Sequence, residues 1–363
     1  STWASKQKSF LMENFYRVQR VRLNILVNDG KPEAGIWNFD KENRLPPPKN
    51  YAWPPYLAHE RDEIDREVSR ELGIEPTDTW ATTRAGALQQ LDHFIKHSLA
   101  NFGPYEDAVS IDSWSMHHSL LSPYLNIGLL HPTEVVEAVV AEYHAERAPI
   151  ASVEALVRQV IGWREYINGM YWYLGPDYRF GNELNANRKL LPLFQDSSKT
   201  NMNCVQHVVA DVHERAWTHH IPRLMILSNL ALITGTNPIE FLDWMREQFI
   251  DASEWVMVPN VIGMGLHADG GTMMTKPYAA GGAYLSRMTQ YCKGCTYDPK
   301  LRVGETACPF TTLYWDFLDR HKEEFVKNHR MSQQVNGLKR LSDLPELKIR
   351  AQEVLIGLDQ GRI

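Results

Sequence analysis

No stretch of the sequence approaches the roughly 18 consecutive apolar residues that a membrane-spanning helix needs, which excludes such a helix. The chain also opens without the charged and then apolar pattern of a secretory signal peptide. We therefore expect a cytoplasmic protein with no membrane partner.

An initiator methionine is missing, because the chain opens abruptly with Ser1-Thr2-Trp3, and this start indicates a fragment of a longer protein. An excess of positive charge is absent too, since the formal net charge is −6 at pH 7. That value weighs mildly against a nucleic-acid partner, because phosphate groups are bound by Lys and Arg. A local cationic groove can lie on an acidic protein, so the net charge does not exclude DNA.

Alternation of apolar and polar residues is nowhere long enough to predict a sheet, and the sequence has no internal repeat. Apolar residues at helical spacing instead predict an all-α body. Helix N-caps are expected at Thr133, Ser152 and Asn237. The predicted helices cover residues 6–28, 61–72, 84–100, 133–145, 152–174, 203–213, 221–234, 238–249 and 311–328.

Prolines separate the first predicted helix from the rest. Pro46 to Pro48 and the pair Pro54-Pro55 indicate an extended connector, because proline fixes φ and has no N–H to donate. We therefore expect residues 1–56 to be the end of an N-terminal region with an interdomain connector. Residues 57–363 are then one helical domain.

Cysteine is scarce, with only four residues in the chain. Cys292, Cys295 and Cys308 have the spacing C-x2-C-x12-C, while Cys204 lies far upstream on a predicted helix. A large cytoplasmic helical chain does not need disulfides, and thiols used only for packing would not usually cluster. The spacing therefore favours a metal site.

Zinc and an iron–sulfur cluster both accept four thiolates. Zinc ribbons pair one C-x2-C with a second, and the second pair is missing here. Pro309 directly follows Cys308, and such a proline is familiar from cluster proteins, where it shields the cluster edge from water. We favour a [4Fe–4S] cluster on Cys204, Cys292, Cys295 and Cys308, with zinc and unligated thiols as the alternatives.

Four ordered blocks carry a family resemblance. HHSLLSPYLNIG (117–128) resembles the segment with which photolyases and cryptochromes hold the FAD phosphates. WREYINGMYW (163–172), RAWTHHIPRLMILSN (215–229) and FIDASEW (249–255) resemble the next three blocks of that superfamily. The cysteine spacing is similar to that of its iron–sulfur bacterial branch. The resemblance implies the all-α FAD-binding domain, with an iron–sulfur segment over 204–309.

The resemblance also implies which residues contact FAD, reduced in the active form. Arg223 and Asp251 would form an ion pair beside the flavin ring, where a cation stabilises the anionic reduced flavin. A purely structural salt bridge is the alternative for that pair, and helix capping is the alternative for the serines. The other implied contacts are Tyr105, His118, Ser119, Leu120, Leu121, Ser122, Arg164, Glu254 and Asn260.

The His219-His220 pair carries the sharpest chemical signal. The resemblance implies that His220 donates the proton that repair of a (6-4) photoproduct requires, because imidazole can carry a proton near neutral pH. Branches that repair cyclobutane dimers have Asn there. Animal-type (6-4) enzymes have a further His where this chain has Leu224, so we expect no catalytic histidine at that position. His220 and His219 are the candidate catalytic histidines. The alternative for His220 is a buried structural histidine.

Three aromatic residues complete the implied site. Tyr278 would line the lesion pocket, where its phenol could hydrogen-bond the photoproduct. Trp163 would pack against the lesion, and Trp244 is the candidate for electron transfer to the flavin. Core packing is the alternative for both tryptophans.

The resemblance therefore implies a (6-4) DNA photolyase, a carbon–carbon lyase in which excited FADH⁻ donates an electron to (6-4) photoproducts in UV-damaged DNA. We expect a monomer, with a ribityl-lumazine antenna only if an N-terminal antenna domain is present. A blue-light photoreceptor cryptochrome without efficient repair is one alternative. An iron–sulfur DNA-binding module, similar to the primase large subunit, is another.

Overall fold

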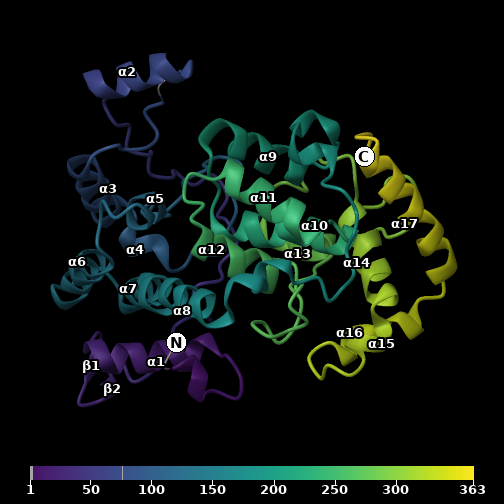
Figure 1. Ribbon diagram of the computed structural model, residues 1–363, viewed down its shortest axis with the longest axis horizontal. Coiled ribbons are helices and arrows are strands. Elements are labelled where there is room, and N and C mark those ends of the chain that lie inside the picture. The colour runs from purple at the N-terminus through teal and green to yellow at the C-terminus, as the bar shows by residue number, and fades with distance from the viewer. Residues whose placement is uncertain (1–2, 76) are drawn as a thin grey trace. The chain divides into compact units, whose positions relative to one another are not determined.

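The computed structural model describes residues 3–75 and 77–363, and Figure 1 shows its ribbon. The chain divides into two compact units. Unit 1 comprises Ser1–Met12, Ala108–Ile111 and Tyr166–Ile363. Unit 2 comprises Glu13–Asp107 and Asp112–Glu165. This division does not test the predicted boundary at residue 56, which stays a prediction.

Unit 2 consists of short helices and one small hairpin. The hairpin pairs Val27 with Pro32 and Asn28 with Lys31. Asp29 and Gly30 join its strands with φ values of 47° and 73°, the left-handed conformations that a two-residue hairpin turn requires. Its elements are α1 (Met12–Leu23) without its first residue, β1 (Val27–Asn28), β2 (Lys31–Pro32), α2 (Glu63–Leu72), α3 (Arg84–His97), α4 (Leu99–Phe102), α5 (Ser122–Asn126), α6 (Pro132–His144), α7 (Ile150–Val157) and η2 (Arg158–Arg164).

The first helix ends earlier than residue 28, where the sequence placed its end. Arg20 is buried, and its guanidinium donates to the carbonyl oxygens of Ile25, Leu26 and Trp37. These bonds hold the chain after Leu23 in a tight turn, so Asp29-Gly30 turns a hairpin instead of ending the helix.

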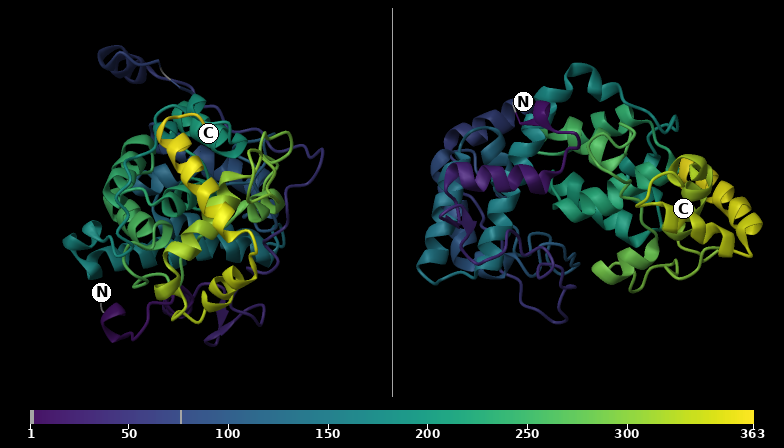
Figure 2. Two further views of the ribbon diagram at one scale, coloured as in Figure 1. Left: turned by 90° about the vertical axis from the view of Figure 1, so that its right-hand side faces the viewer. Right: turned by 90° about the horizontal axis from the view of Figure 1, so that it is seen from below.

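Unit 1 holds the larger hydrophobic core, built mainly from α9, η6, α10, α11, α14 and α17. Helices α14 and α17 lie side by side in Figures 1 and 2. Its elements are η1 (Ala4–Lys6), almost all of α8 (Glu165–Leu174), η3 (Pro176–Phe180), η4 (Pro192–Phe194), η5 (Ser197–Lys199), α9 (Asn203–Arg215), η6 (Pro222–Ser228), α10 (Asn229–Thr234), α11 (Pro238–Gln248), α12 (Glu254–Val258), η7 (Pro259–Gly265), α13 (Gly282–Met288), α14 (Pro309–Arg320), α15 (Lys322–Phe325), α16 (Ser332–Gly337), η8 (Leu338–Arg340) and α17 (Leu344–Asp359).

Among the described residues the fold is helical apart from the small hairpin and isolated bridges, which confirms the all-α prediction. Residues 45–61 have no helix or strand, as predicted for the proline-rich connector. No helix in the described chain has both the length and the apolar character needed to cross a membrane.

Two of the three predicted N-caps are wrong. Asn237 caps α11 by accepting from the N–H groups of Ile239 and Glu240. Thr133, in contrast, lies inside α6, where the His131 side chain is the cap. Ser152 lies inside α7, and its hydroxyl accepts from the Gly103 N–H and donates to the Ala100 carbonyl. The Ser152 hydroxyl, which was expected to cap a helix, instead forms hydrogen bonds between the packed helices α4 and α7.

Candidate functional site

Three helical segments of the described chain are π-helical, and all three coincide with the chain's predicted flavin or lesion region. They are η2 (Arg158–Arg164), η6 (Pro222–Ser228) and η7 (Pro259–Gly265). A π-turn widens the helix and is found frequently at functional sites. Two of them approach closely, because a Cβ on Gly265 of η7 would lie 2.9 Å from Ser228 Oγ at the end of η6.

Arg223 and Asp251, both in unit 1, form the predicted ion pair. Arg223 Nη1 and Nη2 donate to the two carboxylate oxygens of Asp251 at 2.8 and 3.0 Å, while its Nε donates to the Thr218 carbonyl at 2.6 Å. Asp251 is 5% exposed. A two-point guanidinium–carboxylate pair has a fixed orientation. Three hydrogen bonds therefore fix the position of the Arg223 guanidinium.

Aromatic rings surround this guanidinium. The Arg223 Cζ atom lies 4.3 Å from the centre of the Phe249 ring and 5.8 Å from that of Trp217. Phe249 in turn contacts Trp244, which is buried and donates from Nε1 to the Phe194 carbonyl at 2.9 Å. Trp244 is thus joined to Arg223 through one ring, which fits both a relay and core packing.

Glu254 and Asn260 lie in the same unit but have other partners. Glu254 accepts from the Tyr171 hydroxyl and lies in ion-pair distance of Arg179 and Arg246. Asn260 donates from Nδ2 to the Val256 carbonyl one helical turn earlier, at 2.9 Å. Both remain predicted flavin contacts, although protein groups already engage their side chains.

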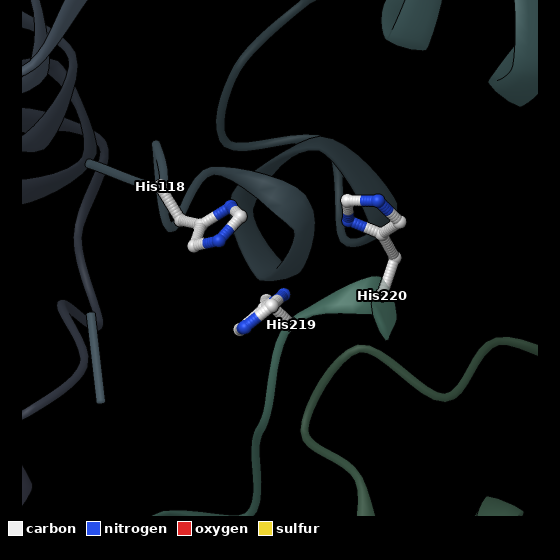
Figure 3. A group of neighbouring side chains, drawn as sticks. All are labelled: His118, His219 and His220. Atoms are coloured by element: carbon white, nitrogen blue, oxygen red, sulfur yellow. The ribbon is translucent and has the colours of Figure 1, made fainter. Parts of the chain in front are cut away.

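His219 and His220 lie at the start of the helix that carries Arg223. Figure 3 shows the two rings, whose centres are 5.7 Å apart with planes at 66°. His219 is buried and its Nδ1 accepts from the Ile221 N–H, whereas His220 is exposed. The alternative of a buried structural histidine is therefore wrong for His220, and its exposure suits a group that meets a substrate. His118, also drawn in Figure 3, belongs to unit 2.

The phosphate-binding segment predicted in unit 2 follows a tight turn. Leu120 has a left-handed φ of 56°, and the Gln90 side chain donates to the Ser119 carbonyl at 3.0 Å. Ser122 is the first residue of α5 and Leu121 its N-cap residue. The alternative for Ser119 and Ser122 was helix capping, but the N-cap residue of α5 is Leu121 and the helix has no side-chain cap.

Arg164 and Trp163 end η2 in unit 2. Arg164 Nη2 donates to the Leu125 carbonyl at 3.0 Å, and burial lowers the pKa of its guanidinium. This bond ties η2 to α5, so the second and first predicted blocks are joined within one unit. Trp163 is half-buried, which leaves both of its interpretations open.

Sequence reasoning missed an aromatic cluster around Tyr105 in unit 2. The Tyr105 ring stacks on His117 at 6.1 Å with planes at 20°, and Tyr51 and Trp53 contact both. His117 is buried, which lowers its pKa to about 4, and its Nε2 lies 3.0 Å from the Tyr51 hydroxyl. The only sequence signal was the Tyr51-Ala52-Trp53 triplet within the proline-rich connector.

Tyr278 lies in the irregular segment between η7 and α13, packed against the core of unit 1. Near the start of this segment lies Asp269, whose carboxylate accepts from the Tyr178 hydroxyl at 2.7 Å and from the Met273 N–H at 2.9 Å. Gly263 makes room for this bond, because a Cβ there would lie 2.3 Å from the Tyr178 oxygen. The segment is therefore tied to η3 (Pro176–Phe180) near its start.

The four cysteines come together in unit 1 from three parts of the sequence. Cys204 is the second residue of α9, Cys292 and Cys295 lie in the turn after α13, and Cys308 is the N-cap residue of α14. The Cys295 N–H donates to the Cys292 carbonyl at 3.3 Å. All four are free thiols, which excludes disulfides in this structure.

The cysteine sulfurs also influence one another's ionisation. Burial, and then the other three thiols, raise the pKa of Cys204 well above its ordinary value. Burial and the neighbouring Cys308 and Cys295 raise that of Cys292 to about 11. Cys204 therefore lies near enough to the other three cysteines to be affected by them, while a metal site on all four stays a prediction.

The predicted flavin residues are divided between the two units. Tyr105, His118, Ser119, Leu120, Leu121, Ser122 and Arg164 belong to unit 2, together with Trp163. The histidine pair, Arg223, Trp244, Asp251, Glu254, Asn260, Tyr278 and the cysteines belong to unit 1.

Known proteins resemble this chain over most of its length. Residues 1–85 match the family model described as deoxyribodipyrimidine photo-lyase-related protein. The chain is 44% identical over 358 residues to a (6-4) photolyase of Agrobacterium fabrum, an alignment that covers 96% of this chain and 70% of that relative. The chain belongs to the family of that (6-4) photolyase.

Two weaker similarities accompany this family assignment. Uncharacterized protein R855 of Acanthamoeba polyphaga mimivirus is 33% identical over 101 residues, covering 28% of this chain and 75% of that protein. The crystal structure of a bacterial class III photolyase from Agrobacterium tumefaciens aligns with a TM-score of 0.47 at 17% identity. That alignment covers 78% of this chain and 57% of the photolyase, so the chain spans less than two thirds of it.

Proposed function

We propose that this chain is the catalytic part of a light-driven enzyme that repairs (6-4) photoproducts in UV-damaged DNA. The observation that carries this function is the 44% identity to a (6-4) photolyase over nearly the whole chain. The exposed His220 beside the Arg223–Asp251 pair supplies the chemistry that such an enzyme needs.

Each unit has residues whose chemistry suits FAD in its reduced form. The two-point Arg223–Asp251 pair offers a guanidinium of fixed orientation, which would stabilise negative charge on a reduced flavin ring. Ser119, Ser122 and Arg164 are polar donors of the kind that bind phosphates. Bound reduced FAD would supply the light-excited electron. Trp244, linked to Arg223 through Phe249, is the proposed residue that returns the flavin to its reduced state.

The chain's own residues then handle the lesion. Flipping the damaged dinucleotide out of the duplex costs a few kcal/mol, and less for a lesion that pairs poorly. His220 donates the proton that lets the hydroxyl group return to its original base, and His219 orients the start of that helix. Tyr278 and Trp163 are the proposed contacts to the lesion, through a phenol and an indole face.

The four cysteines fit a [4Fe–4S] cluster better than zinc. A zinc ion holds its thiolates at about 2.3 Å, which brings tetrahedral sulfurs within about 4 Å of one another. Among the described residues, the group with three ligand atoms mutually within 4.8 Å consists of histidines, and the cysteines form no such group. A cube of four irons takes more widely spaced thiolates. The cluster's role is structural, because it would tie α9 to the segment before α14.

Repair of a defined substrate tests the proposed function. Purified protein is mixed with an oligonucleotide that contains one (6-4) photoproduct, and the restored bases are measured after blue light and after darkness. Repair is expected only in the light. Replacing His220 with Ala should abolish repair while lesion binding persists, whereas a matched Asp211→Asn change on the far end of α9 should leave repair intact.

Other results would favour the alternatives. Flavin absorbance with light-dependent spectral changes but unchanged lesion would indicate a signalling photoreceptor. Protein that contains iron and sulfide, lacks flavin and binds DNA in the dark would indicate an iron–sulfur DNA-binding module. Bound iron, sulfide and flavin are therefore measured on the same sample, and four irons per chain are expected.

The remaining expectations are part of the same proposal. UV-damaged DNA is the partner, and the protein acts as a monomer in the cytoplasm. A ribityl-lumazine antenna would require an additional domain, and the flavin itself absorbs enough light for repair without it.

A further inference from the structure

Tyr278 is presented by an irregular segment, residues 266–281, and not by a helix or strand. A side chain on such a segment recognises a ligand well only if the backbone is held in place, because ordering a loose loop on binding lowers affinity. The question is therefore which groups hold the backbone beside Tyr278.

Asn229 holds that backbone at the peptide of Ala280. Asn229 Nδ2 donates to the Ala280 carbonyl at 2.9 Å, and the Ala280 N–H donates to Asn229 Oδ1 at 3.1 Å. The amide side chain thus pairs with the main chain as a neighbouring strand would. Asn229 is fully buried and also donates to the Met225 carbonyl of its own helix at 3.2 Å.

The helix that supplies this amide also carries the candidate catalytic groups. One uninterrupted helical run extends from His220 to Thr234 through η6 and α10. It has His220 at its first residue, Arg223 in its first turn and Asn229 after the π-turn. Because a helix is stiff, the Asn229–Ala280 pair fixes the Tyr278 backbone relative to His220.

The other anchors of the segment are farther from Tyr278 or more exposed. The Asp269 carboxylate fixes its start, nine residues before the tyrosine. Asn328 donates to the Thr275 carbonyl at 2.7 Å, and Arg330 donates to the Thr275 hydroxyl at 2.9 Å, both at the surface. The pair at Ala280 lies only two residues from Tyr278, and the Asn229 side chain that makes it is fully buried.

We infer that Asn229 is a positioning residue that sets the selectivity for the lesion by holding Tyr278 in register with His220. This inference rests on the proposed function. Asn229 acts on Tyr278 through the backbone of Ala280 and does not itself contact the substrate. Only an amide can serve here, because a carboxylate cannot donate to the Ala280 carbonyl and a hydroxyl is too short to bond both groups.

A double-mutant cycle tests this inference. The ratio of dissociation constants for undamaged and (6-4)-containing duplex is measured for the wild type, Asn229→Ala, Tyr278→Ala and the double variant. Asn229→Ala should lower the ratio about tenfold, the scale of one or two lost hydrogen bonds. In the Tyr278→Ala background the same change should alter the ratio by less than about twofold, since coupled residues are non-additive.

Asn182→Ala is the matched control. Asn182 makes the same two-point pair with the peptide of Ala186, at 3.0 and 2.8 Å, in another loop of unit 1. Its loss should leave the ratio unchanged. Hydrogen exchange of residues 276–281 in the DNA-free protein gives a second readout, and these amides should exchange faster in Asn229→Ala but not in Asn182→Ala.

Two further variants cover a failure of Asn229→Ala to fold. Asn229→Ser is a smaller change in the helix, and Ala280→Pro removes the same N–H donor from the loop side. Retained flavin and far-UV circular dichroism identify folded variants.

Each result decides between the possibilities. A wild type that binds lesion and undamaged DNA equally, and repairs nothing in light, overturns the proposed function itself. A selective wild type with an unchanged ratio in folded Asn229 variants overturns only the positioning role, as does an equal loss in both Tyr278 backgrounds. Loss of folding in all three variants makes Asn229 a residue of the fold and also overturns the inference.

Discussion

Two arginines, one in each unit, use their charge in different ways, and Arg158 is buried while Arg223 is half-buried. Arg158 of unit 2 lies 3.5 Å from Asp40, 3.7 Å from Glu106 and 3.5 Å from Glu154, and all three distances exceed ordinary hydrogen bonds. Arg223 of unit 1 directs both terminal nitrogens to Asp251 at 2.8 and 3.0 Å.

The difference separates a hub of the fold from an oriented cation. Arg158 balances several acids at once, and Glu154 beside it also accepts from the Tyr16 hydroxyl and the Phe39 N–H. Arg223 pairs with a single carboxylate, that of Asp251, which fixes the orientation of its guanidinium beside two aromatic rings. We propose that the geometry of the partners, and not burial alone, distinguishes a structural arginine such as Arg158 from one that acts on a flavin, as proposed for Arg223.

Replacing the hub should have the largest effect. Arg158→Met would leave Glu154, Glu106 and Asp40 without their shared counter-charge, and we expect the free energy of unfolding to fall by about 3–5 kcal/mol. Guanidinium unfolding followed by circular dichroism measures this loss. A fall below about 1 kcal/mol would mean that water or other groups already balance the acids.

The same variant should recover stability in acid. Burial raises the pKa of Glu154, and Arg158 opposes that shift, so Arg158→Met should raise the pKa further. A carboxyl with a raised folded-state pKa contributes stability below its unfolded value, near 4.5, that is lost as the pH rises through the folded-state value.

The deficit of Arg158→Met relative to the wild type should therefore shrink by about 1 kcal/mol or more between pH 7 and pH 5. Unfolding curves for both proteins at pH 5, 6 and 7 provide the measurement. A deficit that is constant over this range would show that the acids stay ionised in the variant.

Changing the oriented cation should affect the flavin more than the fold. Arg223→Lys keeps the charge but cannot make the two-point pair with Asp251, so flavin affinity should fall about tenfold. The free energy of unfolding should fall by about 1–2 kcal/mol, which is less than for Arg158→Met. Flavin fluorescence on dilution measures release, and Arg158→Lys is the comparison. Equal flavin loss in both lysine variants would remove the distinction between the two arginines.

Most helices could be predicted from the sequence because their apolar spacing records which face is buried. The predicted range 203–213 differs from α9 (Asn203–Arg215) by two residues at one end. What failed depended on distant partners. Ser152 does not cap a helix because its hydroxyl bonds to Ala100 and Gly103. The π-turns were missed because apolar periodicity does not distinguish a π-helical turn from an α-helical one.

The candidate site shows the same limit. Local blocks identified His220, Arg223 and Asp251, and the cysteine spacing found three of four thiols directly. Pairs that join distant segments left no local pattern, so the sequence did not reveal Asn229 with Ala280 or Tyr105 with His117. The count of four thiols suggested Cys204 as the fourth member, and only the resemblance assigned roles to the flavin and lesion residues.

A surface arginine, Arg84, should contribute the least to stability of the three arginines compared. Arg84 donates from both terminal nitrogens to the carboxylate of Glu134, and with the His131 N–H it lowers the pKa of Glu134 to about 2. Both side chains are exposed to solvent, which screens their charge. Arg84→Met should therefore lower the melting temperature less than any variant above.

The pH dependence of this pair should have the opposite sign to that of the hub. A lowered carboxyl pKa contributes stability above the unfolded value, near 4.5, and loses it as the pH falls toward 2. The small difference between wild type and Arg84→Met should hence vanish in acid, as thermal melts at pH 7, 4 and 2.5 would show. The His131 capping box remains in the variant, so α6 keeps its start and only the guanidinium is tested. A loss as large as that of Arg158→Met would mean that two-point geometry outweighs burial.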